Sequence, residues 1–93
     1  MLKNFRSKDL EKFYITGKSK NIPSELQKRL LNKIEILDNT VNIEDLQIPL
    51  SNNLEKLLGD LNNYYSIRVN KQFRLIFRFE NENSYDVDFI DYH

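Results

Sequence analysis

The chain has 93 residues, no cysteine, one histidine and equal numbers of basic and acidic side chains, so its formal net charge is zero. This length suits one small domain, which we expect to span residues 1–93. The composition excludes a disulfide framework and a thiolate metal site. No apolar run approaches the roughly 20 residues that span a bilayer, and no secretory signal is visible, so we expect no membrane association.

The amino-terminal third predicts a short strand followed by two helices. Leu2–Phe5 has the pattern of an edge strand. Ser7 suits a helix N-cap, and Gly17 suits the residue that ends that helix. A second helix should start near Ser24, which together with Gln27 has the form of a capping box.

The second helix should supply much of the core and end near Asn39–Thr40. Its apolar residues recur at helical spacing at Leu26, Leu30, Ile34 and Leu37. Residues 42–53 look irregular, and we expect three apolar side chains to attach this segment to the core: Ile43, Leu46 and Ile48. Leu54–Leu58 predicts a short strand.

The last third predicts three antiparallel strands, over residues 64–70, 73–80 and 85–91, with a polar turn at 81–84. Apolar residues alternate with polar ones, as in half-buried strands. A three-residue loop at 70–72 would pair Val69 with Phe73, Ile67 with Leu75 and Tyr65 with Phe77. Two helices followed by this meander predict an α+β fold, in which both helices pack on one face of an antiparallel sheet.

The same register places Arg68 directly opposite Arg74, on the face away from the helices, which Arg78 should share. Like charges that face each other across strands destabilise a sheet, so something should neutralise them. Carboxylates of the last strand could do so, with Asp86, Asp88 and Asp91 available. A bound phosphate could do so equally well.

The charges are strongly segregated along the chain. Residues 64–79 carry four basic and no acidic side chains, whereas residues 80–93 carry five acidic and no basic ones. These blocks fall on adjacent predicted strands and partly cancel. The chain therefore has no strong overall positive field, and any RNA contact must come from a local patch or a surface that is already held close.

The chain ends in Asp91-Tyr92-His93, and each of these residues has two readings. His93 either has no functional role or transfers protons. The second role is chemically suitable because an imidazole titrates near neutral pH. Asp91 pairs with an arginine or orients His93. Tyr92 caps the sheet edge or stacks on an unpaired base. One histidine without cysteine cannot supply the usual metal ligands, so we expect no metal site.

The run GD-x4-YSIRVN-x-QFRLIF-x-F, with the ending VDFIDYH, resembles the HigB plasmid-maintenance killer toxins of the RelE/ParE superfamily. The resemblance covers the whole chain. It implies a RelE-like fold and the toxin role of a type II toxin–antitoxin system. It also implies ribosome-dependent cleavage of messenger RNA, without metal or cofactor, in the cytoplasm.

The resemblance also suggests roles for particular residues. Its implied catalytic set is Arg68, Arg74, Asp91, Tyr92 and His93, and further RNA contacts are expected from Lys56, Arg78 and Tyr64. The implied partners are a cognate helix-turn-helix antitoxin, the ribosome with its mRNA, and operator DNA bound only through the antitoxin complex.

The sequence departs from the family pattern at three places. Leu58 stands where the resembling toxins often carry lysine before Gly-Asp, Asn62-Asn63 replaces Lys-Gly, and Glu55 replaces a histidine that some members carry. Fewer cations should weaken phosphate binding. Two alternatives therefore stay open: a non-nucleolytic toxin of the gyrase-inhibitor type, and a catalytically weakened antitoxin-binding module.

Overall fold

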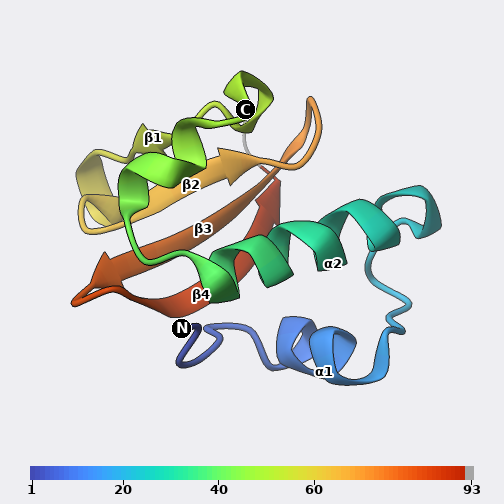
Figure 1. Cartoon of the computed structure of the whole chain (residues 1–93). Coiled ribbons are helices and arrows are strands. Elements are labelled where there is room, and N and C mark those ends of the chain that lie inside the picture. The colour runs from blue at the N-terminus through green and yellow to red at the C-terminus, as the bar shows by residue number, and fades with distance from the viewer. Residues whose placement is uncertain (92–93) are drawn as a thin grey trace.

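The computed structural model describes residues 1–91, in which two helices lie on one face of a four-stranded antiparallel sheet (Figure 1). The helices are α1 (Lys8–Thr16) and α2 (Ser24–Asn39), and the 3-10 helices are η1 (Ile43–Gln47), η2 (Leu50–Asn52) and η3 (Gly59–Leu61). The strands are β1 (Glu55–Lys56), β2 (Tyr65–Arg68), β3 (Phe73–Glu80) and β4 (Asn83–Asp91), in the spatial order β1-β2-β3-β4. The predicted α+β architecture is confirmed.

Both ends of α1 follow the sequence prediction. The Ser7 hydroxyl accepts a hydrogen bond from the Leu10 amide at 3.2 Å, which satisfies an amide that has no partner within the helix. Gly17 ends the helix with φ of 75°, in the left-handed region that glycine adopts without strain. Leu10 and Phe13 then lie buried in the core.

The predicted capping box at the start of α2 is wrong. Ser24 is already the first helical residue, and Pro23 occupies the cap position without a side-chain hydrogen bond. Gln27 instead turns back to the preceding loop, where its Nε2 donates to the carbonyls of Ser19 and Ile22, both at 3.2 Å. The helix ends at Asn39, as expected, and all four stripe residues are buried.

The segment between α2 and β1 is attached to the core by different residues than expected. Leu46 is buried as predicted, but Ile48 is 77% exposed, so its predicted core position is wrong. The fully buried Asn52 fills the inside of this loop, and its Nδ2 donates to the Leu46 carbonyl at 3.2 Å. An amide that can bond the loop's own backbone is more useful there than an alkyl chain, because buried carbonyls need partners.

The β2–β3 hairpin has the predicted register. Ile67 pairs with Leu75, and Arg68 pairs with Arg74. The Val69 amide donates to the Phe73 carbonyl at 3.0 Å, which closes the three-residue loop. Asn70 accepts two backbone hydrogen bonds within that loop, as asparagine commonly does in turns.

The β1 strand, the amino-terminal segment and the β3–β4 turn each contain fewer residues in regular structure or in the turn than predicted. β1 has two residues in place of the predicted five, and Leu2–Phe5 forms two isolated parallel bridges to β4 instead of a strand. The β3–β4 turn is Asn81-Glu82 alone, with φ of 49° and 68°. Positive φ at both positions suits the right-handed twist of a hairpin, so β4 starts at Asn83 instead of Tyr85.

A register shift between Ile76 and Arg78 interrupts the β3–β4 ladder. On β4 this irregularity includes Asp86, whose φ is 53°. An extra residue in one strand bends it and redirects its side chains. Here it turns the Asp86 carboxylate toward Arg78. Within residues 1–91, none of the helices is long and apolar enough to cross a membrane.

Candidate active site

Arg68 and Arg74 face each other across β2 and β3, as predicted, but Arg74 is not on an open surface. Its side chain is only 7% exposed. Its Nε donates to the Ser66 hydroxyl at 2.8 Å, and its Nη2 donates to the Asn53 carbonyl at 2.5 Å. The expectation of a free sheet face is therefore wrong around Arg74, because the segment before β1 folds against it.

Glu55 supplies a carboxylate next to Arg74 that the sequence did not identify. Its Oε2 lies 3.9 Å from Arg74 Nη2. β1 pairs Glu55 with Ser66, which places it beside the guanidinium. The sequence signal that could have found it was its position, where some resembling toxins carry histidine. A negative charge here partly neutralises the arginine pair, a role for which the sequence suggested either carboxylates of the last strand or a bound phosphate.

Arg68 has a different environment from Arg74. It is exposed at the end of β2, and within residues 1–91 it makes no hydrogen bond or ion pair. The two arginines thus divide into one that the protein holds in place and one that can reach a ligand. A guanidinium in the second position can approach a phosphate in bidentate geometry.

Asp91 ends β4 opposite Phe73, and not opposite Arg74. Its carboxylate accepts a hydrogen bond from Gln72 Nε2 at 2.9 Å, so it lies beside the β2–β3 hairpin loop. Ile90 is the register partner of Arg74. The other predicted residues of this motif, Tyr92 and His93, lie outside the described residues.

Arg78 does not join the pair Arg68 and Arg74, because other side chains bind its guanidinium. Its Nε donates to Asp86 Oδ2 at 2.7 Å, its Nη1 donates to Glu80 Oε1 at 2.9 Å, and its guanidinium lies 5.3 Å from the Tyr85 ring centre. For this arginine the ion-pair reading is confirmed. Asp88, another expected partner, pairs instead with Arg6 at 3.9 Å.

The Arg78–Asp86 pair predicts a pH dependence of stability. The hydrogen bond from Arg78 and a second from Asn4 lower the pKa of Asp86. A carboxyl group whose pKa is lower in the folded state stabilises the fold above its unfolded pKa of about 4. That stabilisation is lost as the pH falls through the lower folded value.

We therefore expect Asp86→Asn to lower the free energy of unfolding by about 1 kcal/mol at pH 7. Between pH 7 and about pH 3, the free energy of unfolding should fall less in this variant than in wild type. Asparagine tolerates the positive φ at this position, so backbone strain should not contribute. Urea unfolding at both pH values measures the effect, with the exposed Asp60→Asn as the matched control. Equal acid sensitivity of wild type and Asp86→Asn would contradict the prediction.

The remaining predicted RNA contacts, Lys56 and Tyr64, lie on adjacent chain segments, and each contacts another side chain of the protein. Lys56 on β1 places its Nζ 6.0 Å from the Tyr65 ring centre, and the Arg6 guanidinium lies 5.9 Å from the ring centre of Tyr64. Both are cation–π contacts within one chain. Leu58, at the position where related toxins often carry lysine, is 87% exposed. Within residues 1–91, no group of three or more acidic, histidine or cysteine side chains is arranged to hold a metal ion.

Comparison with known proteins agrees with the fold and the sequence pattern. Residues 3–93 match the family model described as the RelE-like toxin of the type II toxin–antitoxin system HigB. The chain is 47% identical to "Toxin HigB-1" of Vibrio cholerae over 79 residues, covering 84% of this chain and 83% of that one. It is 29% identical to "Endoribonuclease HigB" of Proteus vulgaris over 93 residues, covering all of both chains.

Among solved structures, the fold resembles a chain of the YoeB–YefM complex from Staphylococcus aureus. The TM-score is 0.53 at 21% sequence identity, and the match covers 100% of this chain and 98% of that chain. A second match is the YoeB dimer from the same organism, with a TM-score of 0.51 at 20% identity. At this identity the likeness concerns the fold alone.

Proposed function

Because this chain belongs to the RelE-like toxin family of the type II toxin–antitoxin system HigB, we propose that it is an endoribonuclease that cuts messenger RNA during translation. The observation that carries the proposal is the opposed pair Arg68 and Arg74 at the hairpin end of the sheet. β4 runs beside Arg74 and ends at Asp91, one of the predicted proton-transfer residues. The full-length similarity to a protein named endoribonuclease supports the same reaction class.

The proposed reaction needs no metal. The ribose 2′-hydroxyl loses its proton to a base, and its oxygen attacks the adjacent phosphorus. The bond from phosphorus to the 5′-oxygen breaks, an acid protonates that oxygen, and the products are a 2′,3′-cyclic phosphate and a 5′-hydroxyl end. Positive groups that are already in place stabilise the charge that accumulates on the phosphate oxygens in the transition state.

The arginine pair fits this requirement. Exposed Arg68 would contact the phosphate oxygens, and Arg74 would supply a fixed charge, because the protein already orients its Nε and Nη2. His93 would transfer a proton as acid or base, with Asp91 as its orienting group or as the opposite proton-transfer group. Tyr92 would stack on a base of the message, while Lys56, Arg78 and Tyr64 would contribute at most peripheral contacts.

We propose a helix-turn-helix antitoxin as the neutralising partner, with operator DNA bound only by the toxin–antitoxin complex. The matching family model describes the toxin of a type II toxin–antitoxin system, which supports an antitoxin partner here. The ribosome would present the message, which would place the protein in the cytoplasm. A ribosomal site also compensates for the zero net charge, because steering from solution would be weak.

The experiment is inducible expression of wild type, Arg68→Ala and His93→Gln in a bacterial host, with growth followed and new 5′ ends mapped on transcripts. Arg68 is the sharper arginine to test, because it is exposed and its loss should leave folding unchanged. Wild type should arrest growth and cut within translated frames. Each variant should reduce cleavage by about 100-fold or more.

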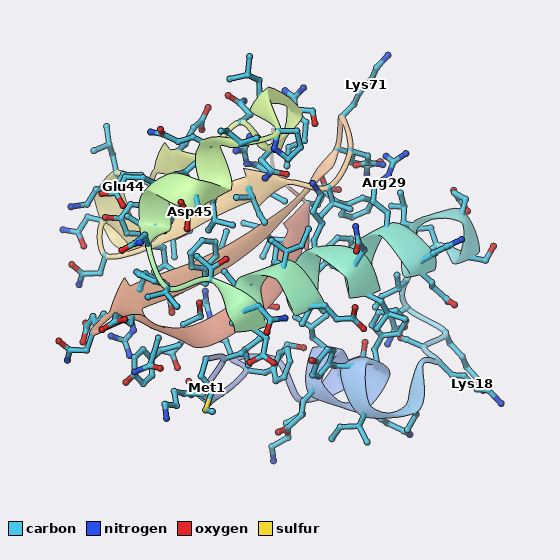
Figure 2. The ribbon with its side chains drawn as sticks, in the orientation of Figure 1. Met1, Lys18, Arg29, Glu44, Asp45 and Lys71 are labelled. Carbon is cyan, nitrogen blue, oxygen red and sulfur yellow. The ribbon has the colours of Figure 1, made fainter. Side chains whose placement is uncertain are left out.

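The matched control is Lys18→Ala, which removes an exposed cation just beyond the carboxyl end of α1 (Figure 2). Arrest of growth without cleavage would favour the gyrase-inhibitor alternative. Soluble wild-type protein that neither arrests growth nor cuts messages would favour the antitoxin-binding module. Full toxicity of both active-site variants would show that the assigned residues are wrong.

A further inference from the structure

A hollow of about 570 Å³ lies between α2, η2 and the β2–β3 hairpin, next to Arg68. Four of its lining residues are cations, and they come from three parts of the chain: Arg29 and Lys33 from α2, Arg68 from the end of β2, and Lys71 from the hairpin loop. Among the described residues 1–91, no acidic side chain lines it. Figure 2 shows Arg29 and Lys71 at the same end of the molecule, with Glu44 and Asp45 on the opposite side.

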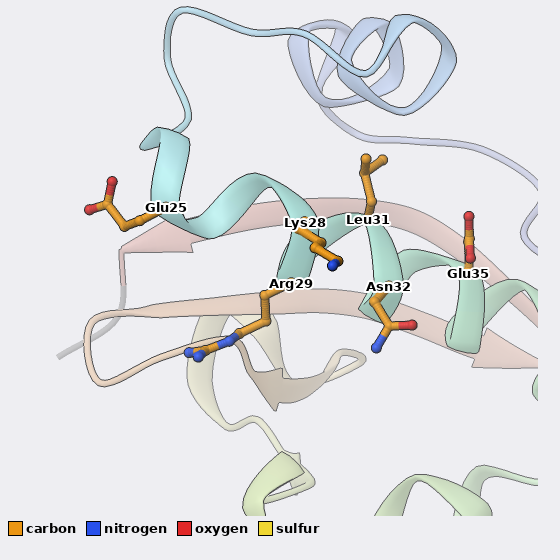
Figure 3. Close-up of a pocket in the computed structure, with 6 residues that line it drawn as sticks. All are labelled: Glu25, Lys28, Arg29, Leu31, Asn32 and Glu35. Atoms are coloured by element: carbon orange, nitrogen blue, oxygen red, sulfur yellow. The ribbon is translucent and has the colours of Figure 1, made fainter.

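Two of these cations are held in place by the protein. Arg29 projects from α2 toward the hairpin (Figure 3), and its Nη1 donates to the Val69 carbonyl at 3.1 Å. Lys33 Nζ donates to Oδ1 of Asn52, which is itself fully buried. Both of these acceptors are neutral. They orient the cations but leave their charge uncompensated.

The electrostatics of the hollow favour an anion. Partial burial lowers the pKa of Lys33, and the nearby Arg29 lowers it further, which means that the neighbourhood already disfavours another positive charge. Within residues 1–91, Arg68 has neither a hydrogen bond nor an ion pair. A bound anion would relieve the repulsion among the cations and form charge-assisted hydrogen bonds with several of them.

We propose that this hollow binds a backbone phosphate of the RNA strand, one or more nucleotides away from the phosphate that is cleaved. The inference rests on the proposed function, since it assumes that the bound strand is RNA. Arg68 links the two places, because it lines the hollow and also faces Arg74. Within residues 1–91, no aromatic side chain lines the hollow, so these residues offer donors for phosphate oxygens and no stacking surface for a base.

The test measures binding without cleavage. A short RNA with 2′-O-methyl groups at every ribose has no nucleophile, so the strand stays intact whatever the catalytic state. Its binding to wild type and to Lys71→Glu is followed by fluorescence anisotropy at several salt concentrations, starting near 50 mM. Lys71 is exposed at the hairpin tip, so its replacement should not disturb folding. The matched control is Lys18→Glu, an exposed lysine outside the hollow.

We expect Lys71→Glu to weaken binding about fivefold at low salt and to reduce the slope of log K against log salt by about 1. Lys18→Glu should change both values much less. A second measurement uses inorganic phosphate, which should shift the backbone amide NMR signals of Val69 and Asn70 more in wild type than in Lys33→Gln. Equal losses in the two glutamate variants, or no loss in Lys71→Glu, would overturn the subsite.

The outcomes for the two proposals are separable. If wild type cuts messages in cells but Lys71→Glu binds the oligonucleotide as tightly as wild type, the phosphate-site proposal is wrong and the nuclease proposal stands. Specific loss of binding in Lys71→Glu, with no cleavage by wild type, would support the phosphate site and overturn the nuclease. Unchanged RNA binding with lost antitoxin binding would make the hollow a protein-docking site and overturn the RNA assignment.

Discussion

Replacing Arg74 with alanine is expected to lower the free energy of unfolding by about 2–4 kcal/mol. The guanidinium is 7% exposed and bonds both the Ser66 hydroxyl and the Asn53 carbonyl. Its loss leaves the buried Ser66 hydroxyl and the part-buried Asn53 carbonyl without their donor and removes the packing of the side-chain stem. A domain of this size has a total stability of about 5–15 kcal/mol, so the loss is a large share of it. Urea unfolding measures it.

Arg74→Lys separates the structural role of Arg74 from its electrostatic role. Lysine keeps the charge but cannot donate along the two fixed directions of a guanidinium. We expect Arg74→Lys to recover part of the lost stability. It should recover cleavage only if the positive charge of residue 74, and not the geometry of its donors, is what the reaction needs. Ser66→Ala is the matched control, because it removes a single hydrogen bond, at about 1 kcal/mol. If Arg74→Ala were as stable as Ser66→Ala, the buried network would have little structural role.

Around Arg74, the sequence predicts the pairing of the strands but not the segment that covers them. The alternation of apolar and polar residues determined the register of the β2–β3 hairpin, because a one-residue slip would have moved every apolar side chain to the solvent face. Arg68 was therefore correctly placed opposite Arg74. Alternation says which face a residue occupies, but not what covers that face. The segment that carries Asn53 and Glu55 has no periodic pattern, so its packing over Arg74 could not be predicted.

The helices were predictable for similar reasons, and their connections were not. The stripe from Leu26 to Leu37 specifies one buried face, and Gly17 marks a helix end by its backbone freedom. The capping box failed because its spacing does not show which residue starts the helix. Ile48 was expected inside because it is apolar, yet loop geometry placed Asn52 there. Hydrophobicity predicts burial well within regular elements and poorly where the backbone itself needs partners.

The basic hollow was missed for a further reason. Helical spacing alone assigns Arg29 and Lys33 to the side of α2 away from its apolar stripe, and alternation alone assigns the hairpin residues to the sheet. They meet only through the tertiary packing of α2 beside the hairpin. A convergence of like charges from separate elements leaves no local signal in the sequence. Its functional weight comes from a lining that, within residues 1–91, contains no acidic side chain, which the segregated charge of residues 64–79 only partly indicates.

Asn52 should prove the most important polar residue of the loop between α2 and β1. It is fully buried, its Nδ2 donates to the Leu46 carbonyl at 3.2 Å, and its Oδ1 accepts from Lys33. Asn52→Ala removes a donor and an acceptor at once, so a buried carbonyl and a partly buried ammonium lose their partner. We expect a loss of about 2–3 kcal/mol in the free energy of unfolding, measured in urea.

Two further variants test whether Asn52 also supports the hollow. Ser51→Ala, at the exposed neighbouring position, should change stability by less than about 0.5 kcal/mol. Asn52→Asp would give Lys33 a carboxylate partner while removing the donor to Leu46. It should therefore destabilise the loop and also weaken oligonucleotide binding, because a negative charge enters the proposed phosphate site. Asn52→Ala should loosen Lys33 without adding that charge and so weaken binding less. If Asn52→Asp bound the oligonucleotide as tightly as Asn52→Ala, Lys33 would not face the strand, and the hollow would be reduced to Arg29, Arg68 and Lys71.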